Sequence, residues 1–341
     1  MLNFIKSQIL KYPYLLPFIK KLLKTFRIRK NDRLINKINK ERSNYASWVE
    51  QTIQIHNLYN IKKRKYIYDN NDIYFQSDYN VYFKYIKNFG LRNLEFNGTN
   101  DRLQLEFILK HLNENTVVFD IGANYGYYCL TIAKNISGSN CFAFEPSKVC
   151  VDTLHDNIKI NQLKNVMVND SAVGSDIGFG MGMGKKNKFG VQYVSSGNSS
   201  DQSDFNMITI DSFVNEYKIT NIDFIKIDIE GAELLALNGG KKSIAKFRPI
   251  VQCELSNNFT IPRYNYSITD VYNYFNSLNY IYAYISKENA LYESRGLEWS
   301  TGSFEKDANN SYEFFFIPNE MKSSIDLSTQ FKNSILKPYA V

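Results

Sequence analysis

Short apolar runs alternate with amphipathic segments between residues 101 and 317. A strand covered on both faces has no polar side, whereas a surface helix is apolar along one side only, so the runs predict strands and the segments predict helices. Such alternation with short connections predicts an α/β fold, a mainly parallel sheet covered by helices on both faces, with an antiparallel strand at its end. The predicted strands span 117–121, 140–145, 165–170, 222–228, 249–254, 279–286 and 311–317, and the predicted helices span 101–112, 125–135, 147–161, 231–238 and 268–278.

The first 72 residues follow a different pattern. Leu, Ile and Phe mix with Lys and Arg at roughly helical intervals over residues 1–30, interrupted by Pro13 and Pro17, and residues 34–66 have a polar helical pattern. The aromatic stretch 73–86 indicates one or two strands. We therefore predict a basic helical N-terminal extension (1–72), a catalytic domain (73–320) and a C-terminal tail (321–341).

A Gly/Ser-rich insertion at 174–206 interrupts the catalytic domain. Its glycines alternate with Phe179, Met181 and Met183 before a polar Ser/Asn run, which predicts a hairpin with an irregular return. Two interpretations are open: a lid over a substrate, and a tolerated surface insertion.

Charge is unevenly distributed along the chain. The net charge is +7, but residues 1–66 contribute +13, which leaves −6 for the remainder. A nucleic-acid groove needs clustered cations, so we expect no nucleic acid to bind the acidic catalytic part. The cationic residues 1–42 favour peripheral contact with an anionic membrane surface, and packing on the catalytic domain or on a second subunit is the alternative.

Three further features bear on the compartment. Cations interrupt every apolar run in the first 30 residues well before the roughly 20 residues that a bilayer requires. No small-residue cleavage pattern follows the short run YLLPFI. The four cysteines lack CxxC spacing and are interpreted as buried thiols. We expect a cytoplasmic protein, peripheral at the inner face of the membrane.

The segment VVFDIGANYGYY contains the first candidate site. Asp120, Gly122, Asn124 and Gly126 lie where a predicted strand turns into a helix, the usual ligand-binding edge of a parallel sheet. Gly122 allows close backbone approach to a ligand, and Gly126 allows the helix to begin against the strand. The carboxylate of Asp120 would repel a dinucleotide pyrophosphate but suits a cationic amine or sulfonium, so the turn favours S-adenosylmethionine.

Two more acids follow the next two strands. Glu145 in FAFEP lies 23 residues after Gly122, close to the spacing of an acid that binds a ribose diol. Asp170 in NVMVNDSAV ends the following strand, where an adenine amino group can be read. With Asp120 these acids form a series at successive strand ends, which favours a cofactor site over unrelated solvated acids.

Several motifs in this order resemble the FkbM family of S-adenosylmethionine-dependent methyltransferases. They are VVFDIGANYGYY, CFAFEPS, LHDNIKINQL, ITIDSFV, IDFIKIDIEGAELLALNGG and FRPIVQCEL, over roughly residues 100–260. The resemblance implies a class I methyltransferase (Rossmann-like) fold with a seven-stranded sheet, and a methyl acceptor that is a hydroxyl of a glycan or polyketide. It assigns the cofactor to Asp120, Gly122, Asn124, Gly126 and Glu145.

The segment IKIDIEGAELL contains the second candidate site. Asp228 ends its strand and Glu230 and Glu233 follow, with helix capping sufficient to explain Glu233. Asp228, Glu230 and Glu254, the last at the end of the next strand, are the candidate catalytic acids: one of them would take up the proton of an acceptor hydroxyl.

A metal interpretation of the second site is open. Asp228 and Glu254, with Asn257 and Asn258, could supply oxygen ligands to magnesium, as in catechol-type methyltransferases. We nevertheless assign no metal, because acidic clusters at strand ends have other uses. His56, His111 and His155 show no ligand spacing.

The leading hypothesis is therefore an O-methyltransferase that uses S-adenosylmethionine and a hydroxyl-bearing acceptor, either a small molecule or a sugar of a surface polysaccharide or related glycan. An NAD-dependent oxidoreductase on a similar sheet and a catalytically inactive cofactor-binding scaffold are the alternatives. Asp120 argues against the first, and the intact acids at three strand ends argue against the second.

Overall fold

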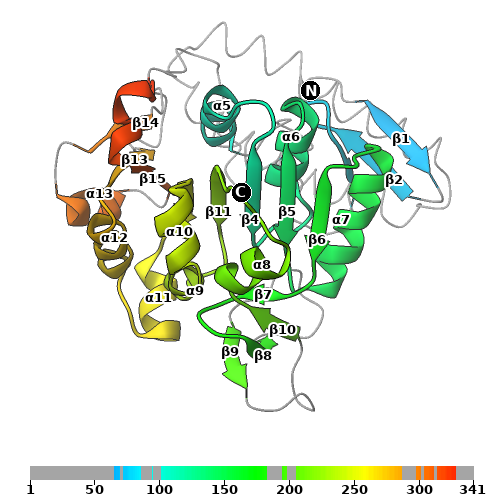
Figure 1. Cartoon of the computed structure of the whole chain (residues 1–341). Coiled ribbons are helices and arrows are strands. Elements are labelled where there is room, and N and C mark those ends of the chain that lie inside the picture. Colours follow the sequence, from blue (N-terminus) through cyan, green and yellow to red (C-terminus); the bar gives the residue numbers. More distant parts are fainter. Residues whose placement is uncertain are drawn as a thin grey trace, which may run out of the picture.

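The computed structural model describes residues 65–69, 72–85, 94, 101–182, 194–197, 205–285, 297–300, 303–310 and 313–327 (Figure 1). The predicted N-terminal extension up to residue 64 and its membrane contact at 1–42 lie outside these residues, as does most of the predicted tail. None of the described helices is long and apolar enough to cross a membrane.

A mainly parallel sheet forms the centre of the molecule, as predicted. Its order is β14-β13-β15-β12-β11-β4-β5-β6, and the strands from β12 to β6 run parallel. β15 is antiparallel to both of its neighbours, which confirms the expected antiparallel strand. The strands are β4 (Val117–Ile121), β5 (Asn140–Phe144), β6 (Val166–Asn169), β11 (Phe224–Ile227), β12 (Ile250–Glu254), β13 (Tyr280–Ile285), β14 (Leu297–Trp299) and β15 (Glu313–Pro318).

The seven predicted strands are all present, and β14 adds an eighth at the edge of the sheet. Its three residues are too few to give a strand pattern in the sequence. Within the described part of the chain, β14 pairs antiparallel with β13 alone.

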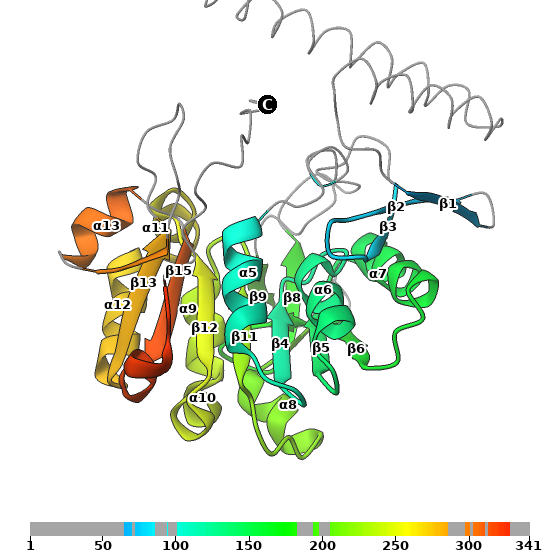
Figure 2. The same cartoon turned by 90° about the horizontal axis from the view of Figure 1, so that it is seen from above.

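Helices cover both faces of the sheet (Figure 2). Neighbouring residues of β4 point to opposite sides: Val118 packs into one apolar core with residues of α5, α6 and α7, and Phe119 packs into the other with residues of α8, α9, α10 and α12. The helices are α5 (Arg102–His111), α6 (Tyr127–Asn135), α7 (Lys148–Ile160), α8 (Ile210–Glu216), α9 (Glu233–Gly239), α10 (Lys241–Phe247), α11 (Asn257–Tyr264), α12 (Ile268–Ser277) and α13 (Phe304–Asn310), followed by the 3₁₀ helix η3 (Asn319–Ser324).

A small antiparallel sheet precedes the main one, with order β1-β2-β3. β2 (Asp72–Gln76) and β3 (Tyr82–Lys84) confirm the strands predicted within 73–86. β1 (Tyr66–Asp69) was not predicted, and it pairs with β2 across the proposed boundary at residue 72. β3 packs against α7 of the catalytic domain.

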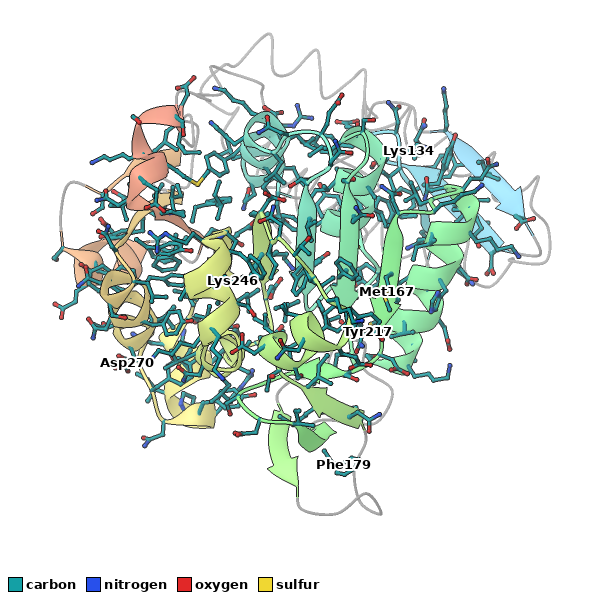
Figure 3. The ribbon with its side chains drawn as sticks, in the orientation of Figure 1. Lys134, Met167, Phe179, Tyr217, Lys246 and Asp270 are labelled. Atoms are coloured by element: carbon teal, nitrogen blue, oxygen red, sulfur yellow. The ribbon has the colours of Figure 1, made fainter. Side chains whose placement is uncertain are left out.

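A second small sheet, β7-β10-β8-β9, lies beside the main sheet and includes Phe179, which is marked in Figure 3. β8 (Gly178–Gly182) and β9 (Val194–Gly197) pair antiparallel, which confirms the predicted glycine-rich hairpin. β10 (Phe205–Ile208) is antiparallel to β8 and parallel to β7 (Ala172–Val173). The remainder of the insertion, 183–193 and 198–204, lies outside the described residues, so the lid interpretation stays a prediction.

All four cysteines lie in the described part of the chain, where they are buried and free, as expected from their spacing. Burial raises the pKa of Cys129, Cys141 and Cys253 above the usual thiol value. These thiols act as core residues.

Candidate active site

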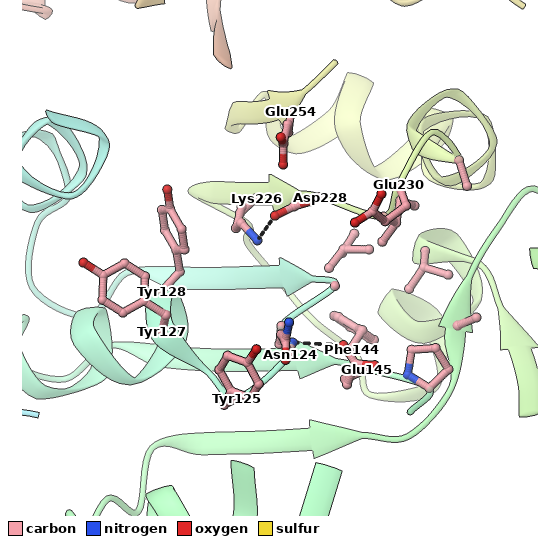
Figure 4. A pocket seen from close by; sticks show the side chains of 18 of the residues that line it. Asn124, Tyr125, Tyr127, Tyr128, Phe144, Glu145, Lys226, Asp228, Glu230 and Glu254 are labelled. Carbon is pink, nitrogen blue, oxygen red and sulfur yellow. Dashed lines mark hydrogen bonds and ion pairs between the residues drawn. The ribbon is translucent and has the colours of Figure 1, made fainter. Parts of the chain in front are cut away.

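A pocket of about 300 Å³ opens at the carboxyl ends of β4, β5, β11 and β12 (Figure 4). Six of the nine residues predicted for the site line it, and three do not. Those that line the pocket are Gly122, Asn124, Glu145, Asp228, Glu230 and Glu254.

The loop after β4 is held in an unusual backbone conformation. Gly122, Asn124 and Gly126 all have positive φ angles, of 79°, 53° and 85°. The amides of Gly122 and Ala123 both donate to the carbonyl of Phe144 at the end of β5, at 2.9 and 3.0 Å. The loop is thereby fastened to the neighbouring strand.

The two glycines are required by close packing. A Cβ atom on Gly122 would lie 2.0 Å from the carbonyl oxygen of Asp228, so this loop touches the backbone that follows β11. A Cβ atom on Gly126 would lie 2.4 Å from Leu154 of α7. Gly126 therefore allows α6 to begin against α7, and it is not among the residues that line the pocket.

Glu145 lies in the pocket with both of its carboxylate oxygens engaged. Oε2 accepts from the amide of Asn124 and Oε1 from the amide of Ser147, each at 2.9 Å. Burial raises its pKa to about 7, although these hydrogen bonds act in the opposite direction. Hydroxyl donors from a ligand would add stabilisation to the ionised form.

Asp170 is exposed and does not reach the pocket. β6 ends at Asn169, whose Oδ1 accepts from the amide of Ser171, and this turn brings Ser171 rather than Asp170 to the pocket wall. The predicted position was that of the acid, whereas the pocket wall beside β5 and β7 is formed by Ser171, Ala172 and Val173.

Asp120 lies beneath the pocket and is 1% exposed. Its Oδ2 accepts from the amide of Cys129 at 3.0 Å, which secures the first turn of α6. Its Oδ1 lies 3.8 Å from Nζ of Lys226 and has no hydrogen-bond partner among the described residues. Burial raises its pKa and Lys226 opposes the rise. Asp120 thus supports the loop from below instead of lining the pocket.

Lys226 is the buried cation at the centre of the site. It lies on β11, in register between Asp120 of β4 and Gln252 of β12. Nζ is 3.2 Å from Oδ2 of Asp228 and 4.9 Å from the centre of the Tyr128 ring. The network continues through Gln252, which donates to Tyr128 Oη at 3.1 Å and to the carboxylate of Glu313 at 2.9 Å.

Asp101 and Glu313 belong to this network and were missed by sequence analysis. Asp101 occupies the N-cap position of α5 but makes no side-chain capping bond; its side chain lines the pocket instead, near Tyr128 and Lys226. Burial raises the pKa of both acids, that of Glu313 to about 8. The sequence signal was weak, because each residue looks like an ordinary acid at the end of an element.

The three predicted catalytic acids have different electrostatic environments. Burial would raise the pKa of Asp228, but the attraction of Lys226 and the interaction with Glu254 outweigh burial and lower it. Burial and then the charge of Asp228 raise the pKa of Glu254 to about 9. Burial and Asp228 also raise the pKa of Glu230, which lies near Arg263. Lys226 thus favours the ionised form of Asp228, and the charge of Asp228 favours the protonated form of Glu254.

Glu233 organises the loop between β11 and α9. It is 1% exposed, and its Oε1 accepts from the amides of Ile229 and Gly231 at 3.2 and 3.0 Å. Glu233 lies in the first turn of α9, but its carboxylate binds loop amides that precede the helix, and α9 has no side-chain capping bond. Its position explains how Glu230, at a φ of 59°, is held at the edge of the pocket.

In the described part of the chain, no group of three or more His, Cys, Asp or Glu side chains is arranged to hold a metal ion. Of the proposed magnesium ligands, Asn257 uses its Oδ1 to accept from the amide of Ile268, at the start of α12. This contact gives Asn257 a packing role between two helices.

The comparisons with known proteins address the family. Residues 120–282 match the model of the methyltransferase FkbM domain. No curated protein matches the chain. An FkbM methyltransferase structure from Methylobacillus flagellatus KT is similar, with 17% identity, a TM-score of 0.41, and coverage of 63% of this chain and 47% of that one. This chain thus spans about half of that protein's length.

Two further solved structures are similar over the same share of this chain. A precorrin-6y C5,15-methyltransferase from Geobacter metallireducens GS-15 has 11% identity, a TM-score of 0.35, and coverage of 63% of this chain and 87% of that one. An rRNA methylase from Streptococcus thermophilus has 9% identity, a TM-score of 0.35, and coverage of 63% and 93%. The family match agrees with the motifs in the sequence and includes the pocket loops from Asp120 to Glu254. Residues 120–282 of this chain therefore belong to the methyltransferase FkbM domain family.

Proposed function

We propose that this protein is an S-adenosylmethionine-dependent methyltransferase that methylates a hydroxyl group, on a sugar of a surface polysaccharide or related glycan. The observation that carries the proposal is one pocket with two chemically different ends. A glycine loop and Glu145 form one end, and Asp228 with its paired Lys226 forms the other. Such a pocket suits a nucleoside methyl donor beside a hydroxyl acceptor.

The residues at the first end fit the donor. Phe144, Ala172 and Val173 give an apolar wall for an adenine ring, and Glu145 offers carboxylate oxygens to ribose hydroxyls. Oδ1 of Asn124 is buried without a hydrogen-bond partner in the described structure. An ammonium or hydroxyl of the ligand would satisfy it, because a buried acceptor without a donor is unfavourable.

The second end would position the acceptor and take up its proton. Bound S-adenosylmethionine supplies a methyl group on a positively charged sulfur. Lys226 holds Asp228 in its ionised form, so the carboxylate can accept the hydroxyl proton. As the proton leaves, the acceptor oxygen forms its bond to the methyl carbon, and the bond from that carbon to sulfur breaks. Holding the donor and the acceptor in one pocket would fix the line of attack.

Glu254 and Glu230 assist from either side. Glu254 keeps its proton and interacts with Asp228, so it can donate a hydrogen bond to the carboxylate or to the acceptor. Glu230 is half-exposed at the pocket edge, where it can accept a hydrogen bond from a second hydroxyl. Carboxyl groups on several sides suit a polyhydroxylated acceptor, and the family resemblance supports a glycan.

Ligand binding and turnover test the proposal separately. Isothermal titration of the full-length protein with S-adenosylhomocysteine and with NAD should show binding of the former only; binding of NAD alone would overturn the choice of cofactor. Incubation with a cell glycan extract and methyl-labelled S-adenosylmethionine should label a glycan. Cofactor binding with no labelled product from any extract would instead favour the inactive scaffold.

We also propose that residues 1–42 hold the protein at an anionic membrane surface, which the concentration of positive charge in this segment supports. Replacing Lys20, Lys21 and Lys24 by Gln should weaken sedimentation with phosphatidylserine vesicles and leave the response to neutral vesicles unchanged. Equal binding of the variant and the wild type to the anionic vesicles would remove this part of the proposal.

A further inference from the structure

Among the described residues, side chains and not another strand cover the outer edge of strand β3. β3 is the last strand of the β1-β2-β3 sheet, and an outer strand leaves backbone groups without strand partners. The amide of Tyr82 donates to Oδ1 of Asn161 at 2.8 Å, and the amide of Lys84 donates to Oδ1 of Asn157 at 2.7 Å. Two asparagines, one turn apart at the end of α7, thus fasten the N-terminal sheet.

The amide groups of these two asparagines are directed to different places. Nδ2 of Asn161 donates back to the carbonyl of Tyr82 and to the carbonyl of Asn157, both at 2.7 Å, so its bonds stay between β3 and α7. Nδ2 of Asn157 donates to the carbonyl of Tyr125 at 3.0 Å. Asn157 is fully buried and connects β3 directly to the loop that follows β4.

Tyr125 is part of the pocket wall and stands between two residues with positive φ, Asn124 and Gly126. The amide of Asn124 donates to Glu145, so the direction of this peptide group and that of the Tyr125 carbonyl are both set by side chains from other elements. β3 makes a second contact on this side: the ring of Phe83 lies 5.9 Å from that of Tyr127, which also lines the pocket.

We propose that Asn157 is a positioning residue through which the N-terminal sheet sets the conformation of the Gly122–Tyr125 loop and hence its affinity for the nucleoside donor. The inference rests on the proposed function only for the identity of that ligand. Asn157 does not line the pocket and would act through the Tyr125 carbonyl.

Asn157→Ala and Asn161→Ala form a matched pair in the full-length protein. Both variants lose a hydrogen bond to the edge of β3, but only Asn157→Ala releases Tyr125. We expect Asn157→Ala to weaken the affinity for S-adenosylhomocysteine about tenfold, as the loss of a buried hydrogen bond implies. Asn161→Ala should lower the melting temperature and leave the affinity within about twofold.

The rate of amide hydrogen exchange distinguishes a positioning role of Asn157 from a merely structural one. Without ligand, the amides of residues 122–128 should exchange faster in Asn157→Ala than in Asn161→Ala. In the wild type, bound S-adenosylhomocysteine should slow exchange of the Lys84 amide, because coupling between two sites is reciprocal. This measurement needs no variant and applies even if Asn157→Ala does not fold.

Equal affinities and equal loop exchange in the two variants would overturn the inference, as would a Lys84 amide that exchanges at the same rate with and without ligand. A wild type that does not bind S-adenosylhomocysteine would count against the proposed function instead. In that case the loop exchange of the two unliganded variants still decides whether Asn157 connects the sheet to the loop.

Discussion

The surroundings of Gly122 leave no room for a side chain. Replacement by Ala would place a Cβ atom 2.0 Å from the Asp228 carbonyl oxygen and would also require a positive φ. We expect Gly122→Ala to lower the free energy of unfolding by more than the roughly 1–2 kcal/mol that a left-handed conformation alone costs. Urea unfolding measures the change.

The matched control for this glycine is Gly178→Ala in β8. Apart from its chain neighbours, no atom of the described residues lies within 4 Å of its added Cβ, and its φ is not positive. Its stability should stay within about 0.5 kcal/mol of the wild type. A Gly122→Ala protein as stable as the control would mean that the two loops are not in contact.

Lys226 is the cation that forms ion pairs with two acids, Asp120 and Asp228. Lys226→Met leaves Asp120 buried without its nearest positive charge, so we expect a loss of about 3 kcal/mol in the free energy of unfolding. Lys148→Met removes an exposed pair with Asp152 and should cost no more than about 0.5 kcal/mol. Comparable losses in the two variants would contradict a central role for Lys226.

Asp228→Asn separates proton uptake from donor binding. An amide of similar size cannot accept the hydroxyl proton, so turnover should fall by about 10²–10⁴-fold while the affinity for S-adenosylhomocysteine stays the same. Asp176→Asn, at an exposed position away from the pocket, is the control and should behave as the wild type. Lost affinity with unchanged turnover would place Asp228 with the donor.

At the site, the sequence predicted the strand ends correctly but not every side chain that reaches them. Glu145 and Asp228 could be placed because each directly follows a strand whose end faces the pocket. Asp170 lies outside the pocket because the turn after β6 brings Ser171 to the wall, and Asp120 lies beneath the pocket, where its side chain accepts from the amide of Cys129. Asp101 is brought in by tertiary packing, which no local pattern reveals.

Among the elements, α8 shows how a short helix is fixed by its cap. Thr209 accepts from the amide of Ser212 at 2.9 Å and Ser212 accepts from the amide of Thr209 at 3.1 Å. Thr209→Ala should therefore lower the free energy of unfolding by about 1 kcal/mol. Ser147→Ala removes an N-cap side chain of α7 that makes no capping bond, and it should have little effect.

Element prediction succeeded where the hydrophobic pattern was long or continuous. The five parallel strands and the helices α5, α6, α7, α9 and α12 were all expected. The helices α8, α10, α11 and α13 were missed: α8, α10 and α13 span seven residues each, and α11 contains Pro262. Segments of two turns depend on capping and packing more than on their own periodicity.

For the whole molecule, buried acids predict a dependence of stability on pH. Burial raises the pKa values of Glu145 and Glu233 to about 7 and that of Glu313 to about 8. The folded protein thus binds these protons more tightly than the unfolded chain, so stability should fall as the pH rises from about 5 to about 8, by on the order of a few kcal/mol. Urea unfolding at the two pH values measures the difference.

Glu313→Gln provides the comparison for this pH effect. The variant lacks one of the titrating groups, so its stability should decrease less between the two pH values. A wild type that becomes more stable toward pH 8 would show that these acids are ionised in the folded protein throughout this range. Bound S-adenosylhomocysteine should reduce the pH effect if its ammonium lies near them.

The four buried thiols make the chain well suited to fluorescence work. A maleimide reacts with accessible thiolates, and every native cysteine is both enclosed in the core and free of disulfides. One new cysteine at Ile177, which is 71% exposed beside the glycine-rich hairpin, would therefore take up a dye at a single position. Such a reporter would allow movement of the hairpin to be followed during ligand binding without first removing any of the natural cysteines.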